Sequence, residues 1–227
     1  YALIAEPRPE DPSNLPVGIN VLDANDQQIG DTYACPGLHG EASSGNLLAI
    51  ACDTGLLMVT DSADGPQITH LPYGEDLPEG KSSTLLGGVG IQYFLGNYGA
   101  DRVVLIDPHQ QAFRLVDLPT RRVHFAVDSV RPQFAYIFTE DGNLHRLNTL
   151  SGEISATLPL TEPYSMDGHW SDPRPRIAVA GDEILVTDPN AAQIHRIDAV
   201  TFEPSGTIAV DGLPMGIVVA GGSGAVH

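Results

Sequence analysis

The chain has 227 residues, of which 42% are hydrophobic and 18% are charged, and its eleven Lys and Arg residues face 29 Asp and Glu residues. This length allows a sizeable core within one all-β domain. The net charge of −18 repels DNA, RNA and anionic membranes, so we expect no nucleic-acid partner. No apolar run approaches the roughly 20 residues that span a membrane, so we also expect no membrane insertion.

Short β-rich segments recur along the chain, bounded by Gly, Asp, Asn and Pro. The first begins at Tyr1, with neither a starting Met nor a visible signal peptide, so we expect a processed or truncated chain. Each repeat opens on one strand type and continues with two further strand-like segments. The opening strands read YALIAEP (1–7), LLAIACD (47–53), IQYFLGN (91–97), FAYIFTE (134–140) and EILVTDP (183–189).

A fourth strand-like element precedes each new repeat, so four strands recur about every 40 residues, which is the period of a β-propeller blade. These elements contain LHGEASSG, STLLGGVG, VHFAVDSV, RIAVAGD and GIVVAGG. The predicted fold is an all-β propeller of four-stranded blades, with about five blades in a single domain over residues 1–227. The element that precedes each repeat is the first strand of a blade, so the chain starts with the second strand of a blade and ends with a first strand. This order permits a closed ring or part of a larger ring. Five blades are few, so we favour the larger ring; a β-sandwich fits the strict repeat less well.

The repeat predicts which side chains meet at one mouth of the propeller channel. The first strand of each blade lines the channel, and the loop that leads into it opens on one face. His39 precedes one first strand, and His124 has the same phase two blades later. Asp167 and His169 lie in the long loop before the next blade. We therefore expect three histidines and a carboxylate at this mouth.

Neutral imidazoles are good ligands for Zn²⁺, and three histidines with one carboxylate or water complete a tetrahedral site. We predict a zinc site formed by His39, His124 and His169, with Asp167 or Glu41 as fourth ligand or as the partner that fixes a histidine tautomer. His227 ends the chain and could add a ligand. Any one histidine alone is more often a surface or hydrogen-bonded residue, and only the repeat sets these three apart.

The chain has two cysteines, Cys35 and Cys52, seventeen residues apart and both predicted at the same mouth. A disulfide, two buried thiols, a metal thiolate and a nucleophile beside His39 are the alternatives. We favour the disulfide, which would stabilise the fold by about 3 kcal/mol and hold the loop that carries His39. A disulfide also implies an oxidising compartment such as a bacterial periplasm.

Several stretches together resemble the AztD-type zinc metallochaperones over essentially the whole chain. They are CPGLHGEA, HLPYGEDLPEGK, PQFAYIFTEDG, EPYSMDGHWSDPRPRIAVAG and GGSGAVH. The resemblance implies a periplasmic propeller that binds Zn²⁺ and hands it to the solute-binding protein of a zinc ABC transporter, without catalysis. By motif, the zinc histidines of that family fall on His39, His124 and His169. We expect the chain to act as a monomer.

Two other functions remain open at the level of sequence. The strand pattern also resembles lactonase-like propellers of the YVTN type, in which a hydrolase would hold a divalent metal through several carboxylates. The histidine-rich set predicted here favours holding zinc over hydrolysis. A non-catalytic interaction scaffold is the third hypothesis, in which the histidines merely fill the channel.

Overall fold

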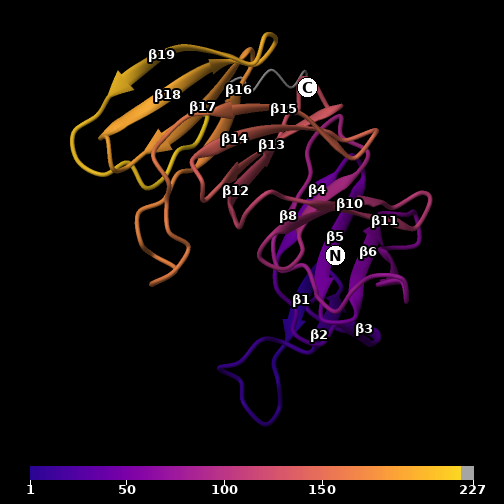
Figure 1. Cartoon of the computed structure of the whole chain (residues 1–227). Helices are drawn as coiled ribbons and strands as arrows, with labels where there is room; N and C mark the ends of the chain where they lie inside the picture. The colour runs from indigo at the N-terminus through magenta and orange to yellow at the C-terminus, as the bar shows by residue number, and fades with distance from the viewer. Residues whose placement is uncertain (221–227) are drawn as a thin grey trace. The chain divides into compact units, whose positions relative to one another are not determined.

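The computed structural model describes residues 1–220, which contain nineteen β-strands and no helix (Figure 1). The strands form five sheets, of which the first has three strands and each of the others four. Strands that follow one another along the chain lie next to one another in a sheet, as predicted for propeller blades. The three-stranded first sheet agrees with a chain that starts at the second strand of a blade. None of the described residues forms a helix long and apolar enough to cross a membrane.

The chain divides into two compact units, which are described separately. Unit 1 comprises Tyr1–Gly99 and Val103–Arg114, and unit 2 comprises Ala100–Arg102 and Leu115–His227. The single propeller domain expected over residues 1–227 stays a prediction.

Unit 1 carries the first two sheets and most of the third. The first sheet contains β1 (Ala2–Glu6), β2 (Gly18–Leu22) and β3 (Gln28–Ala34). The second contains β4 (Glu41–Ser44), β5 (Leu47–Cys52), β6 (Gly55–Thr60) and β7 (Gln67–Pro72). The third contains β8 (Leu85–Leu86), β9 (Phe94–Asn97), β10 (Arg102–Asp107) and β11 (Ala112–Asp117).

Unit 2 carries the fourth and fifth sheets. The fourth contains β12 (Arg122–Val127), β13 (Phe134–Thr139), β14 (Asn143–Asn148) and β15 (Glu153–Pro159). The fifth contains β16 (Ile177–Ala180), β17 (Glu183–Asp188), β18 (Gln193–Asp198) and β19 (Glu203–Ala209). All registered pairs in both sheets are antiparallel.

Burial explains why the strands of one blade differ in composition. The second and third strands of a blade, such as β5 and β6, are apolar along most of their length because both of their faces are covered. The outer strand β15 alternates exposed and half-buried residues, so only one of its faces packs inward. Each unit has its own core, around Ile50 and Leu57 in unit 1 and around Tyr136 and Phe138 in unit 2.

The last predicted first strand, GIVVAGG, differs from the prediction. Residues 211–220 form no strand, and the end of this segment lies outside the described residues. A strand needs a hydrogen-bonded neighbour, and no strand within residues 1–220 pairs with this segment.

Candidate functional site

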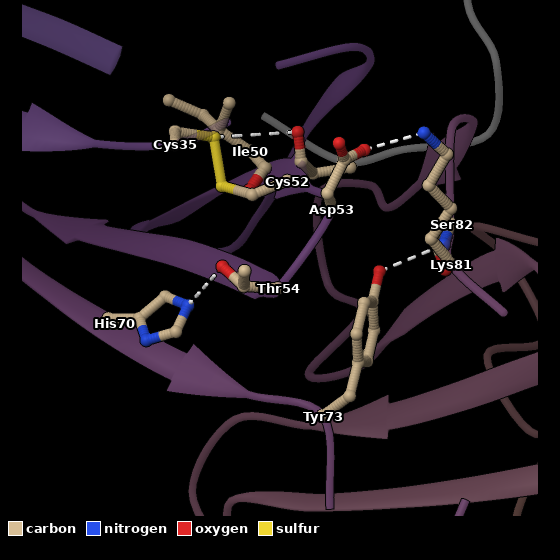
Figure 2. The surroundings of a disulfide bond; sticks show 10 residues. Cys35, Ile50, Cys52, Asp53, Thr54, His70, Tyr73, Lys81 and Ser82 are labelled. Atoms are coloured by element: carbon tan, nitrogen blue, oxygen red, sulfur yellow. Dashed lines mark hydrogen bonds and ion pairs between the residues drawn. A yellow bond between two sulfur atoms is a disulfide. The ribbon is translucent and has the colours of Figure 1, made fainter. Parts of the chain in front are cut away.

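The two cysteines form a disulfide, as predicted (Figure 2). Cys35 follows β3 and Cys52 ends β5, with their Cα atoms 5.0 Å apart. Both residues are buried. The bond joins the outer strand of the first blade to the second strand of the next. The segment between β3 and β4 is therefore tied down at its first residue.

Backbone hydrogen bonds fix the rest of this segment, residues 35–40, which we call the His39 loop. The amide of His39 donates to the carbonyl of Ala51 at 3.1 Å, and the amide of Ala51 donates to Gly40 at 2.9 Å. At the start of the loop, the amide of Asp53 donates to the carbonyl of Pro36 at 2.7 Å. The loop is thus paired with the end of β5 and the following residue at Pro36, His39 and Gly40.

Two glycines allow the His39 loop to pack this closely. Gly37 and Gly40 have φ angles of 65° and 85°, which residues with a Cβ rarely adopt. A Cβ on Gly37 would overlap the carboxylate of Asp53, and one on Gly40 would overlap the carbonyl oxygen of Ser83. Asp53 also forms an ion pair with Lys81 at 2.5 Å, which is visible beside the disulfide in Figure 2.

The position of Ser83 fixes the tautomer of His39. The Nδ1 atom of His39 lies 2.8 Å from the carbonyl oxygen of Ser83. A carbonyl oxygen can only accept, so Nδ1 carries the proton and Nε2 keeps its lone pair. A hydrogen bond of this kind is what typically orients a metal-binding histidine. His39 is also exposed, so its Nε2 can reach a metal ion from solvent.

His124 has the opposite tautomer. It lies in β12, the innermost strand of its blade, and its Nδ1 accepts a hydrogen bond from the amide of Ile177 at 3.1 Å. The lone pair is therefore on Nδ1 and the proton on Nε2. Burial, followed by the charges of Arg176 and Arg122, lowers the pKa of His124 from 6.5 to about 4. Zinc ligation through Nε2 would require a different tautomer and would break the bond to Ile177.

Asp167 and His169 lie in an ordered loop before β16. Arg174 is buried, and its guanidinium donates to three carbonyl oxygens of this loop. The acceptors are Ser165 at 2.9 Å and both His169 and Asp167 at 3.0 Å. These three bonds from one side chain take the place of the strand-to-strand backbone hydrogen bonds that the loop lacks. The loop therefore holds its side chains in fixed positions.

The side chain of His169 is exposed and lies next to Trp170, with ring centroids 5.4 Å apart. Its Nδ1 lies 2.7 Å from the hydroxyl of Ser171 and accepts a longer bond, 3.3 Å, from the Ser171 amide. A hydroxyl can donate or accept, so the imidazole can change tautomer at the loss of only the weaker bond. His169 therefore adapts to a metal ion more easily than His124 does.

The carboxylate of Asp167 already has a partner. Its Oδ1 lies 2.8 Å from Nη1 of Arg121, which also binds Glu140. The hydrogen bond from Arg121 is the main reason that the pKa of Asp167 lies below its usual value. Zinc would have to compete with this guanidinium for the carboxylate.

The predicted ligands are thus distributed over both units: His39 belongs to unit 1, and His124, Asp167 and His169 belong to unit 2. His227 lies outside the described residues. Within residues 1–220, no group of three or more His, Cys, Asp or Glu side chains is arranged to hold a metal ion. The zinc ligand set stays a prediction.

The basic residues that surround the predicted ligands of unit 2 were not among the predicted site residues. Four of the eleven Lys and Arg residues lie in two short segments, Arg121–Arg122 and Arg174–Arg176, which flank the predicted ligands. In a chain with so few basic residues, this concentration is a usable signal. The role of Ser83 has no such signal, because it acts through its backbone.

Solved structures of low sequence identity show the fold class of this chain. The dihydro-heme d1 dehydrogenase NirN in complex with DHE matches with a TM-score of 0.58 at 14% identity, over 94% of this chain and 48% of that one. The WD40 domain of Neurospora crassa Pan2 matches with a TM-score of 0.51 at 12% identity, over 79% and 51% of the two chains. At these identities only the fold is comparable. The predicted all-β propeller fold is confirmed.

Much stronger similarity links the chain to one named protein. It is 55% identical to the zinc chaperone AztD of Citrobacter koseri over 228 residues, which cover 100% of this chain and 54% of that protein. The apo structure of AztD from Citrobacter koseri matches with a TM-score of 0.91 and 54% identity, over 94% of this chain and 58% of that one. A second crystal structure of Citrobacter koseri AztD gives 0.94 and 54%, over 99% and 61%. No protein-family model matches. The resemblance to AztD is therefore confirmed, and the chain spans just over half of the relative's length.

Proposed function

We propose that this chain is part of a periplasmic zinc metallochaperone. It binds Zn²⁺ as cargo and delivers the ion to the solute-binding protein of a zinc ABC transporter, without catalysing a reaction. The similarity to a protein named zinc chaperone supports this over the hydrolase and scaffold alternatives. The disulfide supports an oxidising compartment, in which such bonds persist.

One observation carries the zinc-binding part of the proposal, and it is the tautomer of His39. The carbonyl of Ser83 holds the proton on Nδ1 and leaves the Nε2 lone pair available to a metal ion. No tautomer change and no broken hydrogen bond would accompany ligation by this residue. His169 is the next candidate, since it is exposed and its hydroxyl partner allows either tautomer.

Delivery to a partner requires a ligand that is both accessible and fixed in place. His39 is exposed, yet its loop is tied by the disulfide and by backbone bonds to β5. An incoming protein could therefore approach one ligand at a time without waiting for the loop to order. Preorganisation of this kind lowers the entropy lost on association.

The test is a zinc titration of tag-free protein in competition with a chromogenic chelator. We compare the parent with His39→Gln, His169→Gln and, as a matched control, His109→Gln, which changes an exposed histidine in a turn. His39→Gln should weaken zinc binding at least tenfold, or about 1.4 kcal/mol, and His109→Gln should leave it within twofold. Zinc loss to the purified solute-binding protein, followed by the same chelator, then tests delivery.

A parent that shows no tight zinc site would refute the zinc-binding proposal. A tight site that is insensitive to His39→Gln would remove His39 from the ligand set and leave zinc binding itself intact. Tight binding without transfer to the solute-binding protein would contradict the delivery step alone.

A further inference from the structure

Two inner strands of unit 2 bring basic side chains together. β12 contributes Arg122 and His124, and Arg176 directly precedes β16. The bond from the Ile177 amide to His124 Nδ1 joins the two strands at this point. The pairing of β12 with β13 shifts register between Arg122 and His124, an irregularity of the kind that re-aims side chains.

Arg176 is held in place by its backbone. Its amide donates to the hydroxyl of Thr187 at 2.8 Å, and the Thr187 amide donates to the Arg176 carbonyl at 3.0 Å. Thr187 is fully buried, so this anchor is rigid. The side chain of Arg176 is half-buried, and within residues 1–220 no side chain or carbonyl forms an ion pair or hydrogen bond with its guanidinium.

Arg122 is also partly buried, but its guanidinium has contacts that offset the cost of burying its charge. Its guanidinium lies over the ring of Phe125, 5.5 Å from the centroid, and Nη1 donates to the carbonyl of Arg102. Asp101 is the carboxylate whose charge acts on it, yet burial outweighs this effect and lowers the pKa of Arg122 to about 10. Among the residues that the structure describes, no acidic residue contributes to the pKa shifts of His124 and Arg176.

The polar groups of this cluster are hydrogen-bond donors. His124 presents Nε2–H because its Nδ1 is occupied, and the two guanidinium groups have no acceptor atoms. Both arginines lie close enough to oppose protonation of His124, so they would also oppose a Zn²⁺ ion there. A site that offers hydrogen-bond donors and positive charge favours an anion.

We propose that Arg176, Arg122 and the Nε2–H of His124 form a binding site for a small carboxylate. A guanidinium matches a carboxylate with two parallel hydrogen bonds, which Lys cannot reproduce. The net charge of −18 disfavours a large polyanion, so the ligand is a single carboxylate group, free or on the side chain of an acidic peptide. His124 is then a donor to this anion, and the site does not depend on the zinc-binding proposal.

The probes are sodium succinate and an N-acetylated, C-amidated Gly-Glu-Gly peptide, each titrated calorimetrically at pH 7.5 and constant ionic strength. We compare the parent with Arg176→Gln, Arg176→Lys and the matched control Arg196→Gln. Arg196, on β18, pairs with Glu183 on β17, so the loss of Arg196 changes the net charge by the same amount elsewhere. Arg176→Gln should weaken binding at least tenfold, Arg176→Lys by less, and Arg196→Gln by less than twofold.

Binding of succinate, of the peptide or of both supports the site and identifies the source of the carboxylate. The proposal is wrong if neither probe binds the parent, or if binding is equal in the parent, Arg176→Gln and Arg176→Lys. Zinc titration of Arg176→Gln gives an independent check. Zinc binding that is unchanged or tighter in this variant agrees with a positive cluster that opposes a cation at His124. Weaker zinc binding would mean that Arg176 does not oppose a metal ion there, and this too would overturn the proposal.

Discussion

His39 in unit 1 and His124 in unit 2 occupy equivalent places in the repeat, yet the structure gives them opposite chemistry. Ser83 accepts a hydrogen bond from Nδ1 of His39, whereas Ile177 donates one to Nδ1 of His124. One imidazole keeps a lone pair on Nε2 and the other a proton. Equivalent positions in a repeat therefore need not share a role, because the facing backbone group decides the tautomer.

The surroundings of the two histidines widen this difference. His39 is exposed on a disulfide-bound loop, whereas His124 is half-buried beside two arginines. Solvent around His39 favours exchange of a ligand with a partner. The low polarity and positive charge around His124 favour its neutral form and disfavour a cation. The predictions that follow test each side of this comparison separately.

The largest expected effect is that of removing the disulfide. Cys35→Ala with Cys52→Ala should lower the free energy of unfolding of unit 1 by about 3 kcal/mol, since a closed loop of this length constrains the unfolded chain. Hydrogen exchange should rise in residues 35–53 and stay unchanged in residues 122–139. The measurement is exchange followed by mass spectrometry on the parent and the double variant.

Reduction of the parent under the same conditions is the control, because it breaks the bond without changing the sequence. An equal rise of exchange in both segments would mean that the disulfide does not act locally. Unchanged exchange in residues 35–53 would show that the backbone bonds to β5 hold the His39 loop without it.

The second prediction concerns acid and His124. The pKa of His124 is about 4 in the folded chain and about 6.5 when unfolded, so the unfolded state binds more protons between these values. The contribution of neutral His124 to the free energy of unfolding is complete above pH 6.5 and is lost as the pH falls from 6.5 to about 4. Between pH 7.5 and 4.5 it amounts to about 2–3 kcal/mol, measured by urea unfolding at both pH values.

His124→Gln should remove most of this pH dependence, whereas His109→Gln should retain it. Part of the dependence will remain in both variants, because burial also lowers the pKa of His145. An unchanged pH profile in His124→Gln would contradict the burial and charge assigned to His124.

The strand pattern and the disulfide were predictable from sequence because both depend on local signals. Turn residues and apolar runs recur with the blade period, and this period places Cys35 and Cys52 at the same end of their strands. The final predicted strand in residues 216–222 shows the limit of this reasoning. An apolar segment forms a strand only where another strand offers hydrogen bonds.

The chemistry of the histidines was not predictable in the same way. Ser83 lies 44 residues from His39, and Ile177 lies 53 residues from His124. Both contacts are made by backbone groups, which every residue has. The amino-acid types of Ser83 and Ile177 therefore do not indicate these contacts. The basic segments around His124 were visible as a concentration of arginines, but their effect depends on burial.

The smallest expected effect concerns Asp167, which is mostly exposed and bonded to Arg121. Arg121→Gln should raise the pKa of Asp167 towards its usual value, because the guanidinium that stabilises the carboxylate is lost. Carbon-detected NMR of the Asp167 carboxyl group follows this directly, and Arg196→Gln is the control. If Asp167 were a zinc ligand, the freed carboxylate would also bind zinc more tightly in Arg121→Gln. A changed pKa with unchanged zinc affinity would instead assign Asp167 to the ordering of its loop, and would leave His39 as the better supported zinc ligand.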